Sequence, residues 1–110
     1  MASQVSSTAK PVARVGDTIQ GYCRGPGHVK DRPFTGTWTQ GSDTATADGL
    51  PCIRVGDIGV TDCNHMVTAT TGSDMSTNTG IQLHRVGDVC HTEGGGVGTT
   101  MSGSDTTLSE

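Results

Sequence analysis

Two short motifs alternate along the chain at nearly constant spacing. Both steps between the Gly-Ser-Asp motifs are 31 residues, as is the second step between the Arg-Val-Gly-Asp motifs, whereas the first of those steps is 40. The motifs lie at Arg14–Asp17, Arg54–Asp57 and Arg85–Asp88, and at Gly41–Asp43, Gly72–Asp74 and Gly103–Asp105. Agreement between two independent markers indicates three copies of one unit. The nine extra residues of the first copy fall within Thr18–Gln40, around Val29–Trp38.

The two ends of the chain carry complementary parts of a repeat. Only "TTLSE" follows the third Gly-Ser-Asp motif, while "KPVA" precedes the first Arg-Val-Gly-Asp motif and resembles the connectors "LPCI" and "IQLH". In this alignment Pro11 matches Pro51, and Val12 matches Cys52 and Leu83. Open repeat arrays carry distinct capping ends instead. We therefore predict a single domain over residues 1–110, with units of about 9–48, 49–79 and 80–110, in which the N-terminal strand completes the third unit and closes a pseudo-threefold ring.

The composition limits the size of any hydrophobic core. Leu, Ile, Val and Phe together make 18 of 110 residues, and the aromatic residues are Tyr22, Phe34 and Trp38. No apolar pattern has the helical period, whereas Thr and Val favour strands and Gly favours tight turns. The predicted class is all-β, with short strands and much loop. So small a core needs a cross-link, a metal or a partner for stability.

Charge and hydropathy remove several function classes. The net charge of −4 and pI near 5.4 argue against nucleic-acid binding, which needs a basic face. The sequence contains no run of 18 apolar residues, so it predicts no membrane-spanning helix. The first ten residues, "MASQVSSTAK", lack the apolar segment of a secretory signal. Four cysteines in such a chain favour thiols or metal ligands over disulfides.

Each Arg-Val-Gly-Asp motif is predicted to form a turn. The glycine can adopt positive φ, and the aspartate side chain can bond the backbone just downstream. The repeated glycines and aspartates are therefore interpreted as structural turn residues rather than as a cation site, and the arginines are expected either to cover the strand ends or to pair with nearby carboxylates. The turn residues are Gly16, Asp17, Gly56, Asp57, Gly87 and Asp88.

The repeated motifs resemble those of the PAAR-repeat proteins over essentially the whole chain. "KPVARVGD" at Lys10–Asp17 is similar to the Pro-Ala-Ala-Arg motif, with Val12 in place of the first alanine, and "LPCIRVGD" and "IQLHRVGD" look like degenerate copies. The Gly-Ser-Asp motifs resemble the family's Gly-Ser-Pro segments. The aspartate in these motifs and the nine-residue insertion depart from the family pattern.

The resemblance implies a role. PAAR proteins are small cones that cap the trimeric β-helical spike of contractile injection systems, in phage tail baseplates and in type VI secretion, and hold zinc near the vertex. We accordingly expect a non-enzymatic structural protein, one cone per spike trimer, that sharpens the spike for membrane piercing and touches the target membrane transiently. Its expected location is the virion tail, or the bacterial cytoplasm before secretion.

Cysteines and histidines gather between each turn and the following Gly-Ser-Asp motif. Cys23 and Cys63 each lie six residues after their turn aspartate, His28 and His65 follow them, and Cys90 and His91 occupy the third copy. If these loops converge at one end of the ring, their side chains converge as well. Structural zinc takes four N or S ligands in a tetrahedron.

The preferred ligand set is His28, Cys63, His65 and His91, the three-histidine, one-cysteine pattern that the resemblance suggests. Cys23 is the main rival and Cys90 a weaker one, and the ion is expected to be one structural zinc rather than iron. A Cys23–Cys63 disulfide is the alternative, because the two positions are equivalent. Cys52 aligns with strand positions and is interpreted as a small core residue, and His84 as no ligand.

The sequence also bears on two other function classes. A metalloenzyme would use Glu93 as general base, but the chain has no HExxH, GxSxG or deaminase signature and few residues to build a substrate pocket. An adhesive or ligand-binding tip module would expose an aromatic patch, for which Phe34 and Trp38 are the candidates. We expect these two side chains to pack the insertion onto the cone instead.

Overall fold

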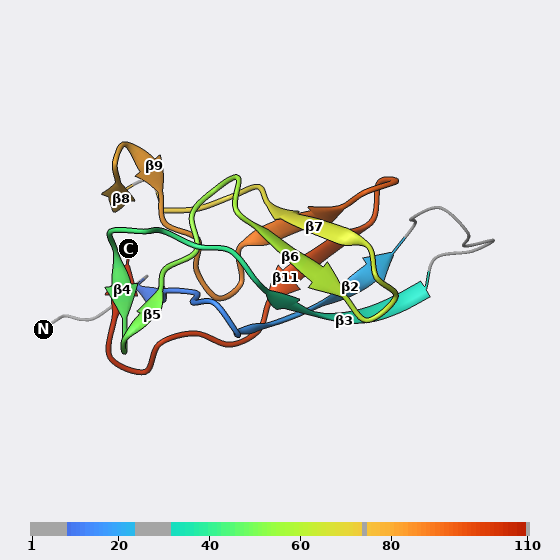
Figure 1. Cartoon of the computed structure of the whole chain (residues 1–110), viewed down its shortest axis with the longest axis horizontal. Helices are drawn as coiled ribbons and strands as arrows, with labels where there is room; N and C mark the ends of the chain where they lie inside the picture. The colour runs from blue at the N-terminus through green and yellow to red at the C-terminus, as the bar shows by residue number, and fades with distance from the viewer. Residues whose placement is uncertain (1–8, 24–31, 74, 110) are drawn as a thin grey trace, which may run out of the picture.

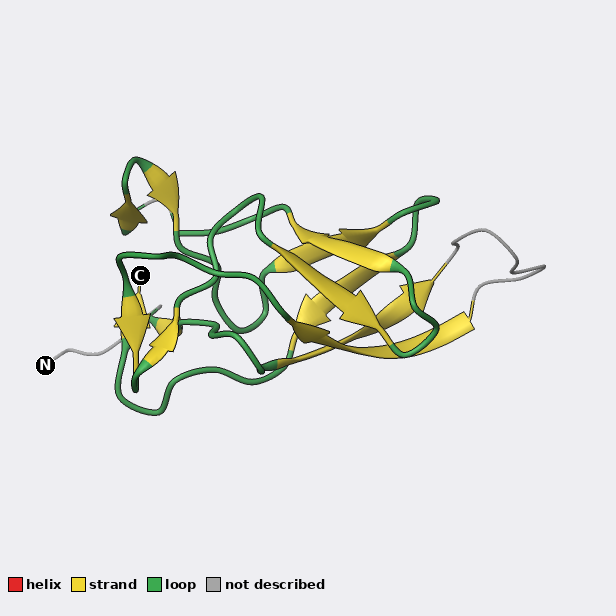
Figure 2. Ribbon diagram, viewed as in Figure 1, coloured by secondary structure: helices red, strands yellow, loops and turns green. Residues whose placement is uncertain are grey.

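The chain forms an all-β structure, which confirms the predicted class. The computed structural model describes residues 9–23, 32–73 and 75–109. Strands, turns and loops account for all of these residues (Figure 2). There is thus no helix of the length and apolarity needed to cross a bilayer within the described part of the chain.

Six antiparallel strands close into a small barrel. Each repeat contributes one hairpin, which begins just after its Arg-Val-Gly-Asp motif and ends just before its Gly-Ser-Asp motif. The strands are β2 (Thr18–Cys23), β3 (Arg32–Trp38), β6 (Ile58–Thr61), β7 (Met66–Ala69), β10 (Val89–Thr92) and β11 (Val97–Thr100). Their order around the barrel is β10-β11-β2-β3-β6-β7, and the β7–β10 pairing closes it. The segments expected to be irregular loops are thus the longest strands of the molecule.

Three two-residue ladders lie at the other end of the molecule (Figure 1). Two of them join strands that are neighbours in sequence, whereas the third joins the two ends of the chain. They pair β4 (Thr46–Ala47) with β5 (Leu50–Pro51), β8 (Thr77–Asn78) with β9 (Ile81–Gln82), and β1 (Lys10–Pro11) with β12 (Leu108–Ser109). The predicted completion of the third repeat by the N-terminal strand is therefore confirmed.

A cycle of backbone hydrogen bonds ties the three repeats together. The amide of Ala13 donates to the carbonyl of His84 at 2.9 Å, that of His84 to Ile53 at 2.8 Å, and that of Ile53 to Ala13 at 2.9 Å. All three residues are fully buried. Each repeat donates to one neighbour and accepts from the other, so the backbone has the predicted pseudo-threefold arrangement.

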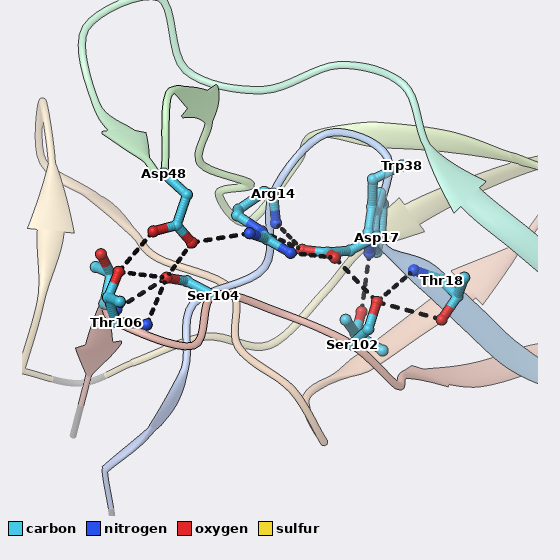
Figure 3. A network of polar contacts seen from close by, with 10 residues as sticks. Arg14, Asp17, Thr18, Trp38, Asp48, Ser102, Ser104 and Thr106 are labelled. Atoms are coloured by element: carbon cyan, nitrogen blue, oxygen red, sulfur yellow. Dashed lines mark hydrogen bonds and ion pairs between the residues drawn. The ribbon is translucent and has the colours of Figure 1, made fainter.

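The three Arg-Val-Gly-Asp turns share one geometry. Gly16 has φ of 96°, with similar values in the other two copies, and such backbone is strained for any residue with a side chain. The Asp17 carboxylate accepts from the amide of Arg14 at 2.7 Å and from its guanidinium at 3.0 Å (Figure 3). The arginine–aspartate pairing is as expected. The predicted direction of the backbone bond was wrong, because the aspartate caps the amide three residues upstream rather than one downstream.

Glycines let neighbouring strands of the barrel approach one another closely. A Cβ on Gly21 would lie 2.2 Å from the carbonyl oxygen of Val97 on the neighbouring strand.

The insertion lengthens the first hairpin, whose strands have six and seven residues against four in the others. Phe34 and Trp38 are buried in the core at 3% and 0% exposure, so the patch required by an adhesive module is not formed by them. Cys52 is also buried, in a second cluster with Val12 and Ala47, as predicted.

Candidate metal centre

Two residues of the preferred ligand set, Cys63 and His65, converge with the rival candidate Cys23 at the end of the barrel that carries the hairpin turns. Strand β2 ends at Cys23, and the turn between β6 and β7 carries Cys63 and His65. Their sulfur and nitrogen atoms all lie within 4.8 Å of one another. Cys23 is fully buried, whereas the other two residues are partly exposed. Residues about 40 positions apart in sequence thus form one group of donors that could hold a metal ion.

The spacing of the donor atoms suits a tetrahedral ion. The two Sγ atoms are 3.6 Å apart, and His65 Nδ1 lies 3.0 Å from Cys23 Sγ and 3.7 Å from Cys63 Sγ. Zinc bonds of about 2.3 Å to sulfur and 2.0–2.1 Å to nitrogen place tetrahedral ligands roughly 3.5–3.8 Å apart. Two of the three separations match that range and the third is shorter, so a small ion fits after a slight outward movement of the His65 ring.

Local hydrogen bonds hold the turn in place. The hydroxyl of Thr61 accepts from the backbone amide of His65 at 3.0 Å, and its oxygen lies 3.1 Å from Cys63 Sγ. Since the hydroxyl proton remains available, Thr61 can donate to a Cys63 thiolate, which stabilises its charge. Asn64, at the corner of the turn, has φ of 67°, a conformation that asparagine tolerates better than most residues.

The third repeat lacks this donor set. Its turn places Gly94 and Gly96 where the second repeat has Cys63 and His65, and the turn closes with the same backbone hydrogen bond from Thr92 to Gly96. The buried hydroxyl of Thr92 has no hydrogen-bond partner within the described residues. The donors therefore lie at the meeting point of the first two repeats, and the centre is asymmetric.

His91 is not brought to this group, contrary to the expected ligand set. Strand β10 directs Cys90 and Thr92 into the barrel, so alternation leaves His91 exposed on its outer surface. There His91 Nδ1 lies 2.9 Å from the hydroxyl of Thr70. Cys90 is a buried core residue, and desolvation raises its thiol pKa to about 12. The remaining predicted ligand, His28, lies outside the described residues.

A second polar cluster, which no sequence motif predicts, lies at the centre of the ring. His84 is fully buried, with Nδ1 2.7 Å from the carbonyl oxygen of Thr71 and Nε2 2.7 Å from the hydroxyl of Thr100. The indole of Trp38 donates to the same hydroxyl at 2.9 Å and meets the imidazole edge-on. Both ring nitrogens of His84 are thus engaged in hydrogen-bond contacts within the ring.

No protein-family model matches the sequence, and no curated protein matches it at a significant level. The PAAR resemblance therefore depends on the motifs and their spacing. The class that the structure itself defines is a small all-β protein with a closed six-stranded barrel and a Cys/His group that could hold a metal ion.

Proposed function

We propose that this protein is the tip of the central spike of a contractile injection system, either a phage tail or a type VI secretion apparatus. The observation that carries the proposal is the closed ring of three repeats within one chain, tied by the cycle of hydrogen bonds among Ala13, Ile53 and His84. A monomer with internal threefold geometry can present equivalent surfaces to the three subunits of a trimer. The PAAR-like motifs favour a trimeric β-helical spike protein as the partner.

The end with the three short ladders is the proposed docking face. Each ladder exposes one large apolar side chain: Leu50 on β5 is 40% exposed, Ile81 on β9 37%, and Leu108 on β12 57%. Exposed apolar side chains gathered at one end of a molecule are typical of an interface. The two-stranded ladders also have edges to which strands of a β-helix can add by backbone hydrogen bonds. The opposite end, with the hairpin turns and the candidate metal centre, would then be the vertex.

The stoichiometry of the complex tests this proposal. Native mass spectrometry of the full chain mixed with the trimeric spike protein from the same genome should show one chain per trimer and no higher occupancy. Three chains per trimer, or no complex at micromolar concentration, would contradict the coaxial arrangement.

Charge substitutions test which face docks. We expect a combined Leu50→Lys, Ile81→Lys and Leu108→Lys variant to bind the spike trimer at least about a hundredfold more weakly, since each buried anchor contributes about 1–2 kcal/mol. The matched control is Val60→Lys, Met66→Lys and Val97→Lys, whose native side chains are 38–46% exposed on the barrel wall. Equal loss in both variants, or loss only in the control, would place the interface elsewhere.

We infer further that the Cys/His group binds one structural zinc ion. Two thiolates and an imidazole are ligands that zinc favours, and their partial burial restricts water, as in a structural site. Cys23, Cys63 and His65 supply three donors, and His28 remains the sequence-based choice for the fourth. Zinc here would link the end of β2 to the β6–β7 turn and so support a barrel with a small core.

Metal content in single-residue variants tests the zinc assignment. The purified chain should carry about one zinc, and both Cys63→Ser and His65→Ala should reduce it severely, while His91→Ala should retain it. At free zinc about a thousandfold above Kd, binding stabilises the native state by about 4 kcal/mol, so thermal stability should fall in the first two variants alone. Loss of zinc in His91→Ala would restore the ligand set expected from the sequence.

A further inference from the structure

The same two cysteines are placed for a second kind of chemistry. The Cys23 and Cys63 thiols are not joined by a disulfide, and their sulfur atoms are 3.6 Å apart. A disulfide requires about 2.05 Å, a movement of about 1.5 Å that a partly exposed turn can supply. Cys63 lies in such a turn, between the four-residue strands β6 and β7.

The two thiols differ in access to solvent. Cys63 is partly exposed and can meet a reagent, whereas Cys23 is fully buried, with Cys63 Sγ within contact distance. An accessible attacking thiol with a second thiol against it allows exchange through a mixed disulfide that the second thiol then resolves. Cys52 and Cys90 are buried in other parts of the core, and desolvation raises the pKa of each thiol. Neither has the thiolate character that reaction needs.

We propose that Cys23 and Cys63 form a reversible redox pair whose oxidation excludes the metal ion. In the first step the Cys63 thiolate attacks a small-molecule disulfide such as oxidised glutathione, forming a mixed disulfide and releasing one thiolate. Cys23 then attacks Cys63 Sγ, the mixed disulfide breaks, and the second leaving thiolate takes the Cys23 proton. Two protein thiols are oxidised and one external disulfide is reduced to two thiols.

Metal binding and the disulfide are mutually exclusive states of this site. Thiolates are the ligands of zinc, and a disulfide sulfur is not. Oxidation removes two of the three donors, while bound metal occupies the sulfurs and protects them. Either state links the end of β2 to the β6–β7 turn. On the proposed function, a tip that leaves a reducing cytoplasm for an oxidising exterior would keep this link in both environments.

Oxidation of the full chain with and without zinc tests the redox pair. The metal-free chain, treated with oxidised glutathione, should fall from four titratable thiols to two, and peptide mapping should find Cys23 linked to Cys63. The same chain preloaded with zinc should keep four thiols for at least ten times longer. The oxidised chain should bind no zinc until dithiothreitol restores its thiols.

Two variants separate failure of this inference from failure of the zinc assignment. Cys52→Ala with Cys90→Ala should still form the disulfide, and Cys23→Ser should stop at the mixed disulfide on Cys63. Persistence of four thiols in the metal-free wild-type chain, or a linkage through Cys52 or Cys90, would overturn the redox pair. If the disulfide forms equally fast with zinc present, the mutual exclusion of metal and disulfide is wrong. A chain that binds no zinc but forms the disulfide would contradict the zinc assignment and leave the redox pair intact.

Discussion

Ala13, Ile53 and His84 occupy equivalent positions and make the same backbone hydrogen bonds, but their side chains differ in chemistry. The backbone therefore carries the symmetry, and the side chains fill the centre unequally. A carbonyl oxygen only accepts, so the bond to Thr71 places the proton of His84 on Nδ1. Nε2 then accepts from the hydroxyl of Thr100, which in turn accepts from the Trp38 indole. Every polar atom in this chain of bonds is satisfied when the imidazole is neutral.

Acid should destabilise the fold through His84. Burial lowers its pKa, although the bond to Thr71 and the Asp88 charge oppose the shift and the Arg85 charge adds to it. Below the unfolded value of about 6.5 the unfolded chain takes up a proton that the native state does not. The free energy of unfolding should then fall by up to about 1.4 kcal/mol per pH unit until the native pKa is reached. Urea titrations between about pH 5 and 7 measure this slope.

The control for this prediction is His84→Gln, which can keep hydrogen bonds but does not titrate. The free energy of unfolding of this variant should fall less steeply with decreasing pH than that of the wild type, by the contribution of one proton. This difference in slope is expected whatever the stability of the variant at neutral pH. Parallel slopes would mean that His84 is protonated in the native state or that other groups dominate the acid response.

At the scale of the element, the three Arg-Val-Gly-Asp turns share one backbone geometry but differ in the hydrogen bonds that their aspartates accept. Asp17 accepts from the amide and two guanidinium nitrogens of Arg14 and from the hydroxyl of Ser102 (Figure 3). Among the described residues, the Asp57 carboxylate accepts only from Arg54, through its amide at 2.8 Å and its Nε at a long 3.5 Å. Arg14 is also held by Asp48 of the neighbouring ladder at 2.8 Å. The first turn thus connects the barrel to the ring of ladders.

We expect Asp17→Ala to be more destabilising than Asp57→Ala by about 1–3 kcal/mol. The two carboxylates are similarly buried, at 5% and 6% exposure, so their removal differs mainly in the number of charged hydrogen bonds lost. Chemical denaturation of both variants gives the comparison directly. Equal losses would show that the cap on the backbone amide, which both turns share, accounts for the whole contribution.

At the scale of the whole molecule, the ring could be predicted from sequence but the barrel could not. Two markers with equal spacing define a repeat regardless of its conformation. Strand β6, in contrast, buries Gly59 and Thr61 and exposes Val60, the reverse of a usual strand pattern. The reason is steric, because a Cβ on Gly59 would lie 2.4 Å from the carbonyl oxygen of Thr37 on β3. Such close packing depends on partners distant in sequence.

The same limit explains the metal centre. Equal offsets from the turn aspartate correctly paired Cys23 with Cys63, and proximity in sequence brought His65 with them. Successive side chains of a strand point to opposite faces, so whether His91 points into or out of the barrel depends on the register of its hairpin. The number of residues between the turn aspartate and His91 does not reveal that register. The position of the candidate centre was therefore predictable and its ligand set only partly so.

A circular permutant tests the equivalence of the three units as a whole. The register Lys10↔Ser109 matches that of Leu50↔Ala47, which a two-residue Asp48–Gly49 turn connects. In the permutant, an Asp-Gly linker joins Ser109 to Lys10, and the new chain ends lie between Thr79 and Gly80. Its melting temperature should be close to that of the native chain, because the β8–β9 ladder loses its turn while the β1–β12 ladder gains one. A chain truncated after Ser104 should melt lower, since it loses β12 and the bond from the Val12 amide to the Thr107 carbonyl. If the permutant melts no higher than the truncated chain, the terminal ladder is not equivalent to the other two.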